Sequence, residues 1–266
     1  MLESVQGSLT VNALMTGREE LVTLNRGENP SAVQEKIREH EINQVPVLDD
    51  GDVVGLMIAD PEDRTLPEDG SYEPIAPKWL VSADTSIRRF IDILDDDRHP
   101  ARFVFQENEV VGLVTYADLN DAVARTALYL LISQLEIKLA RLIRMGEEDI
   151  WTYVQILDEG RQEELDDLQD EMKEKDVVHD LVEHFKLGDV IGIVRDEPSL
   201  LDQTEVSSRD HFNGLVGGVE NMRHDVAHSV RLVVDSVDGV KEVNHACCSI
   251  ERLLDKIPPQ SPQLAP

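Results

Sequence analysis

The chain has 266 residues, with 54 acidic residues against 25 Lys or Arg, and a formal net charge of −29 at pH 7. Such a charge repels nucleic-acid phosphates at ordinary salt and counts against binding to nucleic acid through surface charge alone. No apolar run approaches the roughly 20 residues that a membrane helix needs, and Met1 to Thr10 lack the segments of a secretory signal. We expect one or two domains, no membrane partner and a cytoplasmic location.

The acidic residues are spread along the whole chain, and lysines are few. In a cytoplasm with very high salt the Debye length falls to a few ångströms, so self-repulsion is screened. The chain therefore resembles a halophilic protein of the haloarchaeal type. Its two cysteines, Cys247 and Cys248, are adjacent and cannot close a structural loop, which fits a reducing compartment. No His/Cys cluster has zinc spacing, so we predict no metal site and no required cofactor.

An internal repeat occupies the N-terminal part of the chain. The sequence Asp52–Leu56 (DVVGL) recurs 57 residues later as Glu109–Leu113 (EVVGL). Each copy follows a β-like run, Gln44–Leu48 in the first and Arg102–Phe105 in the second, with turn residues between the two strands. Each copy is therefore predicted to contain a hairpin.

An amphipathic helix precedes each hairpin, at Ser31–Glu39 and at Ser86–Leu94. A repeat of this order and length resembles the cystathionine-β-synthase (CBS) domain, over about residues 9–65 and 76–123. The resemblance implies that the two copies pack as a Bateman module. It also implies an adenine nucleotide (AMP, ADP or ATP) as a regulatory ligand. The stretch Pro61–Pro77, rich in Pro, Asp, Glu and Gly, reads as the connecting loop.

The family ends each copy with a ligand-binding G-h-h-[ST]-x-x-D motif, which the second copy matches at Gly112, Thr115 and Asp118. A threonine at a helix start can help to hold a phosphate, and the aspartate can accept hydrogen bonds from ribose hydroxyls. The same spacing also forms a capping box that needs no ligand. The first copy departs from the motif with Ile58 in place of Thr and Asp60 one position early, so we expect its site to be lost or rebuilt.

A long amphipathic helix follows, from Asp118 to Met145, and Gly146 is predicted to end it. We assign residues 1–120 to the CBS pair, 121–257 to a helical domain and 258–266 to a disordered tail. The fold class is α+β: a CBS pair of β-α-β-β-α repeats followed by an all-α helical bundle. The remaining segments are predicted as helices at 147–157, 177–185, 187–191, 208–219 and 243–254, a helix or loop at 158–176, and a connector at 198–208.

The stretch Asn221–Arg231 (NMRHDVAHSVR) concentrates chemistry-bearing side chains. Apolar residues recur at helical spacing from Met222 through Val234, which predicts a helix over the whole stretch. Arg223, His224 and His228 then lie within two turns, with the histidines on one face. Imidazole can move a proton near neutral pH, and a guanidinium can stabilise charge on phosphorus.

The spacing of Arg223 and His228, with polar His224 directly after the arginine, resembles the R-x(4–6)-H motif of the HEPN superfamily. HEPN domains are helical and usually dimeric; many are metal-independent endoribonucleases, and others bind without cutting. The resemblance implies catalytic roles for Arg223, His224 and His228, an RNA substrate and a homodimer. In the alternative interpretation the histidines are surface residues and Arg223 pairs with Glu220 or Asp225.

Two functions therefore remain open. The first is an adenine-nucleotide-sensing protein whose helical domain is a metal-independent endoribonuclease. The second is a non-catalytic nucleotide sensor whose helical part dimerises or binds a partner.

Overall fold

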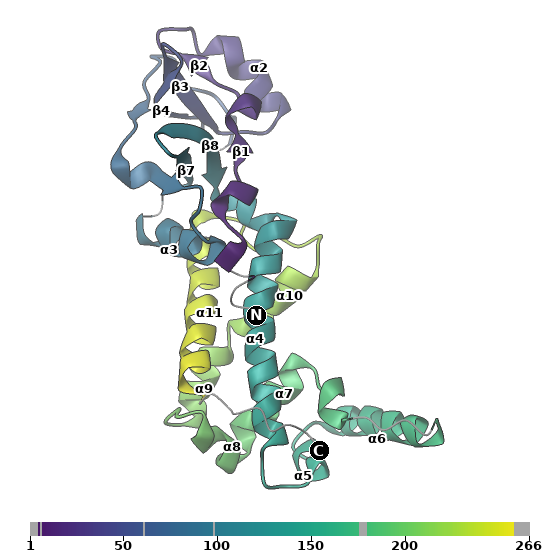
Figure 1. Ribbon diagram of the computed structural model, residues 1–266. Helices are drawn as coiled ribbons and strands as arrows, with labels where there is room; N and C mark the ends of the chain where they lie inside the picture. The colour runs from purple at the N-terminus through teal and green to yellow at the C-terminus, as the bar shows by residue number, and fades with distance from the viewer. Residues whose placement is uncertain (1–4, 6, 61, 98, 176–179, 258–266) are drawn as a thin grey trace. The chain divides into compact units, whose positions relative to one another are not determined.

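A computed structural model describes residues 5, 7–60, 62–97, 99–175 and 180–257 (Figure 1). The predicted tail at 258–266 lies outside these residues. The chain forms two compact units: one comprises 7–124 with 234–240, and the other comprises 1–6, 125–233 and 241–266. None of the helices in the described ranges is long and apolar enough to cross a membrane.

The first unit contains two four-stranded sheets. One has the order β1-β8-β7-β6 and the other β2-β3-β4-β5. The strands are β1 (Thr16–Gly17), β2 (Leu24–Asn25), β3 (Gln44–Asp49), β4 (Asp52–Ile58), β5 (Glu73–Pro74), β6 (Leu80–Ser82), β7 (Ala101–Gln106) and β8 (Glu109–Thr115). The predicted hairpins are confirmed as the antiparallel pairs β3–β4 and β7–β8.

Glycine is required where a short strand crosses each hairpin. A Cβ at Gly55 would lie 2.4 Å from the Glu73 carbonyl oxygen, and one at Gly112 would lie 2.5 Å from that of Thr16. Both distances are shorter than any real Cβ contact. The repeated glycine therefore allows β5 and β1 to pair with β4 and β8.

The predicted helices are confirmed as α2 (Ser31–Glu39) and α3 (Ile87–Asp97). α2 buries Val33 and Ile37 in a core with strands β2, β3 and β4. Short 3-10 helices complete the unit: η1 (Val11–Ala13), η2 (Arg18–Glu20), η3 (Pro77–Trp79) and η4 (Tyr116–Asn120). The first copy does not continue into the expected helix after β4; Asp60 instead caps a turn, accepting hydrogen bonds from the backbone N–H groups of Glu62 (2.8 Å) and Asp63 (3.2 Å).

The second part of the chain is helical, as predicted. Its elements are α4 (Ala122–Arg144), α5 (Ile150–Val154), α6 (Glu159–Glu174), η5 (Leu181–His184), α7 (Leu187–Asp196), α8 (Pro198–Gln203), α9 (Arg209–Val216), α10 (Val219–Ala227) and α11 (Val237–Lys256). Leucines along α4 and Cys247 on α11 are buried in the core. Ser208 caps α9 by accepting a hydrogen bond from the His211 N–H.

Two local predictions differ from the structure, and one that was left open is decided in favour of a helix. Residues predicted as a connector form α8, because Pro198 occupies its first turn and the Glu197 carboxylate caps it. The acidic stretch with two open interpretations is the helix α6, held by buried Arg161, which pairs with Asp189 at 2.8 Å. The helix predicted at 177–185 is only the short η5, and residues 176–179 lie outside the described part.

The helix predicted through Val234 ends at Ala227, because long-range hydrogen bonds take up its last carbonyls. The Arg125 guanidinium donates to the carbonyl of Asp225 (2.7 Å), to that of His228 (3.3 Å) and to that of Arg231. A cation at a helix C-terminus also complements the helix dipole. Val230, one of the apolar residues at helical spacing, is 93% exposed.

Candidate functional site

A cavity of about 370 Å³ opens in the CBS-like unit beside the second copy of the motif. Its walls come from both copies. They are Thr16 on β1, Glu20 to Val22 before β2, His40 to Gln44 between α2 and β3, and Leu113, Thr115, Ala117 and Asp118 at the end of β8. This volume falls in the range of small-molecule sites.

Thr115 and Asp118 form the capping box that the spacing allows. The Thr115 backbone N–H donates to Asp118 Oδ2 (2.5 Å), and the Thr115 hydroxyl donates to the same oxygen (3.0 Å). The Thr115 hydroxyl also accepts from the Ala117 N–H (3.2 Å). The first N–H groups of η4 are thus engaged within the protein, that of Tyr116 with the Pro100 carbonyl and that of Ala117 with Thr115. Both bonds to Asp118 end on Oδ2, which leaves Oδ1 for a ligand hydroxyl.

Burial raises the pKa of the Asp118 carboxyl above its ordinary value, against the lowering effect of the bonds from Thr115. The charge of nearby Asp121 raises the pKa further. A carboxylate in such surroundings is costly to keep ionised. Asp118 is therefore a hydrogen-bond acceptor at the cavity wall whose charged form the protein stabilises only in part.

Gly112, the third predicted ligand residue, does not line the cavity. It lies within β8, opposite Gly17, where the close approach of Thr16 excludes a side chain. Its place in the motif has a structural explanation.

The charge of the lining limits the ligands that the cavity can take. Glu20, Glu41 and Asp118 line it together with His40, and none of its lining residues is Lys or Arg. The apolar side chains of Val22 and Ile42 offer surfaces for a flat base. The sequence analysis did not predict that Val22 and Ile42 line the cavity. The repeat could have indicated that these residues of the first copy face the end of the second copy.

The structure brings two of the three residues of the HEPN-like motif into contact. The rings of His224 and His228 lie edge to face with centroids 4.5 Å apart, and both residues are exposed. Arg223 is exposed on α10 and acts electrostatically on Glu136 of α4, whose pKa burial raises and Arg223 lowers. Asp225, one of the two acids named in the alternative interpretation, pairs with Arg231 at 3.5 Å.

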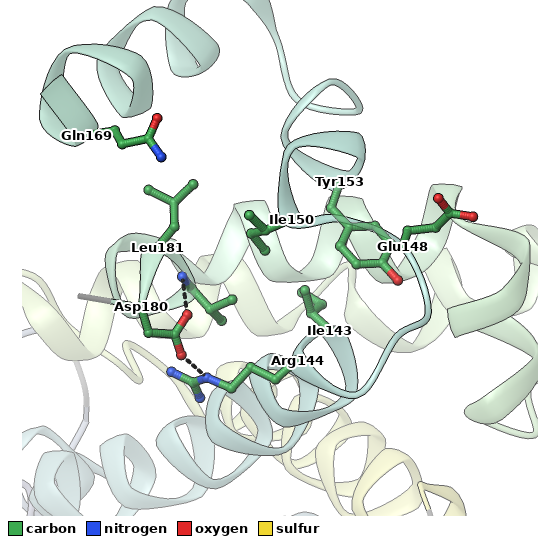
Figure 2. A pocket seen from close by; sticks show the side chains of 9 residues that line it. Ile143, Arg144, Glu148, Ile150, Tyr153, Gln169, Asp180 and Leu181 are labelled. Carbon is green, nitrogen blue, oxygen red and sulfur yellow. Dashed lines mark hydrogen bonds and ion pairs between the residues drawn. The ribbon is translucent and has the colours of Figure 1, made fainter. Parts of the chain in front are cut away.

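A second cavity, of about 320 Å³, lies in the helical unit between the end of α4, α5, α6 and η5 (Figure 2). Arg144 and Asp180 form an ion pair at its wall, and Asp180 accepts from the Val182 N–H at 3.0 Å. Both interactions engage the Asp180 carboxylate within the protein, while Glu148, Tyr153 and Gln169 are further polar residues of the lining. Among the described residues, no group of three or more His, Cys, Asp or Glu side chains is placed to hold a metal ion.

Comparison with known proteins agrees with the repeat. The family model for the CBS domain matches residues 11–57 and again 75–125. No curated protein matches the chain.

Several solved structures are similar over this part. The CBS domain of a bacterial CNNM/CorC-family Mg2+ transporter in complex with ATP is 20% identical, over 47% of this chain and 92% of that one, with a TM-score of 0.37. CBSX2 in complex with AMP is 18% identical, over 45% and 97%, with a TM-score of 0.36. A functionally unknown conserved domain from Neisseria meningitidis is 19% identical, over 44% and 82%, with a TM-score of 0.37. Together with the repeat and the paired hairpins, the two family matches identify the N-terminal part of this chain as a tandem pair of CBS domains.

Proposed function

We propose that the CBS pair is a sensor of an adenosine-containing ligand, bound in the cavity that Asp118 lines. The observation that carries this is Asp118 itself, because Thr115 fixes one of its oxygens and no donor among the described residues engages the other. A ribose offers two neighbouring hydroxyls that suit such a carboxylate. Val22 and Ile42 would hold the base between them.

The acidic lining favours a ligand of low negative charge. Each added phosphate brings negative charge towards Glu20, Glu41 and Asp118, with no Lys or Arg in the wall to offset it. We therefore expect affinity to fall from AMP to ADP to ATP. Because salt screens this repulsion, the differences should shrink as salt rises.

Calorimetry with AMP, ADP, ATP and GMP in molar salt tests the proposal. Asp118→Ala should weaken AMP binding at least about tenfold, since a hydrogen bond to a charged group contributes about 1.5–3 kcal/mol. Asp121→Ala is the matched control, because Asp121 is exposed, nearby and outside the lining. Equal binding by the two variants would place the ligand elsewhere, and no binding by the unaltered protein would reject the sensor.

For the helical part, we propose a metal-independent endoribonuclease of the HEPN type. The contact between the His224 and His228 rings on an exposed helix end favours it. His228 would move the proton, His224 would orient it or the RNA, and Arg223 would stabilise the phosphorus centre. The net charge of −29 requires high salt for an RNA to approach.

Cleavage of single-stranded RNA in EDTA and high salt tests this activity. His228→Ala should reduce the rate about 10²–10⁴-fold, and Arg223→Ala about 10²–10³-fold. His245→Ala is the control, since His245 is also exposed but lies on α11. Equal cleavage by all variants would indicate a contaminant. No cleavage by any, with or without nucleotide, would favour the non-catalytic sensor.

A single motif supplies half of a composite site, so we also propose a homodimer in a halophilic cytoplasm. Exposed Val230 and Leu232, 93% and 62% accessible beside His228, are apolar side chains that a second copy could cover. Light scattering at about 2–4 M salt, where the screening length is ~3 Å or less, should give twice the chain mass. A monomer mass would reject both the dimer and a composite site.

A further inference from the structure

The two CBS copies are related by a shift of 57 residues that extends to their side walls. Thr16 pairs with Leu113 in one half, and Glu73 pairs with Leu56 in the other. A shift of 57 positions therefore gives, for a residue that lines the open cavity, the equivalent residue in the other half of the pair.

The two aliphatic walls of the cavity have aromatic counterparts. Val22 and Ile42 line the open cavity, and the residues 57 positions later are Trp79 and His99. The polar end of the cavity is changed as well, because Ile58 stands where the other half has Thr115. Both the base-binding and the ribose-binding positions therefore differ in character.

The two aromatic side chains fill the space between them. The Trp79 and His99 rings are 4.4 Å apart between centroids and tilted by 30°. Trp79 is 5% exposed and belongs to an apolar cluster with Leu56 and Phe103, against which Ile58 also packs.

A hydrogen bond to the backbone holds the imidazole in this arrangement. His99 Nδ1 lies 2.8 Å from the Ala101 carbonyl oxygen, and its Nε2 lies 3.8 Å from a Glu73 carboxylate oxygen, beyond hydrogen-bond distance. The buried indole N–H of Trp79 has no hydrogen-bond partner among the described residues. Ring packing is therefore what holds Trp79 in place.

We infer that the Trp79–His99 pair occupies the first copy's ligand position, so that the CBS pair takes one ligand per chain. The identity of the ligand rests on the proposed function, whereas the closure of the first copy's position by the two rings does not depend on it. The difference in size between the two pairs then determines which of the two equivalent positions is open: Val22 and Ile42 leave space, whereas Trp79 and His99 fill it.

An exchange of the two walls of the open cavity for those of the closed position tests which position binds AMP. Val22→Trp with Ile42→His copies the closed walls into the open cavity and should weaken AMP binding at least about 100-fold, because ring atoms take the ligand's volume. The unaltered protein should bind one AMP per chain by calorimetry. His99→Ile, a milder change in the closed half, should leave that affinity and stoichiometry unchanged. Two AMP per chain, with one remaining after the exchange, would overturn the inference.

Fluorescence tests the closure without requiring that any nucleotide binds. The chain has two tryptophans, so Trp151→Phe leaves Trp79 as the only emitter. We expect weak quenching by acrylamide that saturating AMP does not change, and stronger quenching after His99→Ile. Strong quenching that AMP suppresses would show that the pair opens for ligand and would overturn the inference. Weak quenching without any AMP binding would retain the closure and reject the proposed ligand.

Discussion

Replacing Asp118 by Asn separates a capping role from a ligand role. Asn keeps an oxygen that can accept from the Thr115 N–H, so the cap can persist. It removes the charge that burial makes costly. If Asp118 is purely structural, Asp118→Asn should leave the ligand affinity unchanged. If Asp118 binds the ligand, the substitution should lower the affinity without lowering the stability of the protein.

The effect on stability follows from the sign of the pKa shift. Because the folded-state pKa of Asp118 is raised, its protonated form is favoured by folding. This contribution is fully present below the unfolded-state pKa and is lost as pH rises through the folded-state pKa. Asp118→Asn should therefore melt at the same temperature as the unaltered protein or above it at pH 7. The difference should become smaller as pH falls towards 3.8, the ordinary value.

The effect on affinity comes from the lost charge-assisted hydrogen bond. About 1.5–3 kcal/mol corresponds to roughly 10–150-fold weaker binding of AMP. Thermal melts across pH and calorimetry at pH 7 measure the two effects. Asp121→Asn, with the same change in net charge, should leave AMP affinity nearly unchanged. A melting temperature that falls by about 2–4 °C, the loss of ~1 kcal/mol of capping, together with unaltered affinity, would refute the ligand role.

Three further substitutions test the packing. Arg102 is fully buried and donates to the carbonyls of Ile93, His99 and Ala101, so Arg102→Ala should lower the unfolding free energy by about 3 kcal/mol or more in denaturant titrations. Gly146→Ala places a Cβ 1.9 Å from the Tyr153 hydroxyl oxygen; it should cost about 1–3 kcal/mol, and Tyr153→Phe should recover part of it. Arg125→Ala should increase proteolysis at residues 228–232, measured by mass spectrometry; unchanged cleavage would mean that Arg125 does not hold this segment.

Local patterns predicted most of the fold because they report local causes. The β-like run at Gln44–Leu48 and the helical spacing in Ser31–Glu39 depend on neighbours a few residues away, and both elements formed as expected. The helix end near Gly146 was also predicted. Gly146 does not have a positive φ, and its lack of a side chain instead makes room for Tyr153.

Features set by distant residues could not be predicted in this way. The motif identified Thr115 and Asp118, but their opposing walls, Val22 and Ile42, lie more than 70 positions earlier in the chain. Trp79 and His99 carry no motif, and only the register of the repeat relates them to those walls. Pro198 is the exception, because a proline at a first helical turn is a local signal that the connector prediction overlooked.

The segment after α10 shows why a helix pattern can fail where function is expected. Apolar spacing favoured a helix through Val234, yet the Arg125 guanidinium takes the carbonyls at the C-terminus of α10 within one unit. Within the other unit, Asn120 fixes Val234 from both sides, donating to its carbonyl (2.7 Å) and accepting from its N–H (3.1 Å).

Asn120 and Arg125 follow Asp118 by two and seven residues along the chain. The stretch that ends the proposed ligand cavity is therefore continuous with the residues that hold the segment from His228 to Val234. Asn120 and Arg125 both bind backbone groups of that segment, so they fix its path independently of its side chains. A helical continuation would carry Val230 and Leu232 in a regular spiral, whereas the clamped path leaves both exposed beside His228. The long-range hydrogen bonds, and not the local apolar spacing, thus set where the histidine stands.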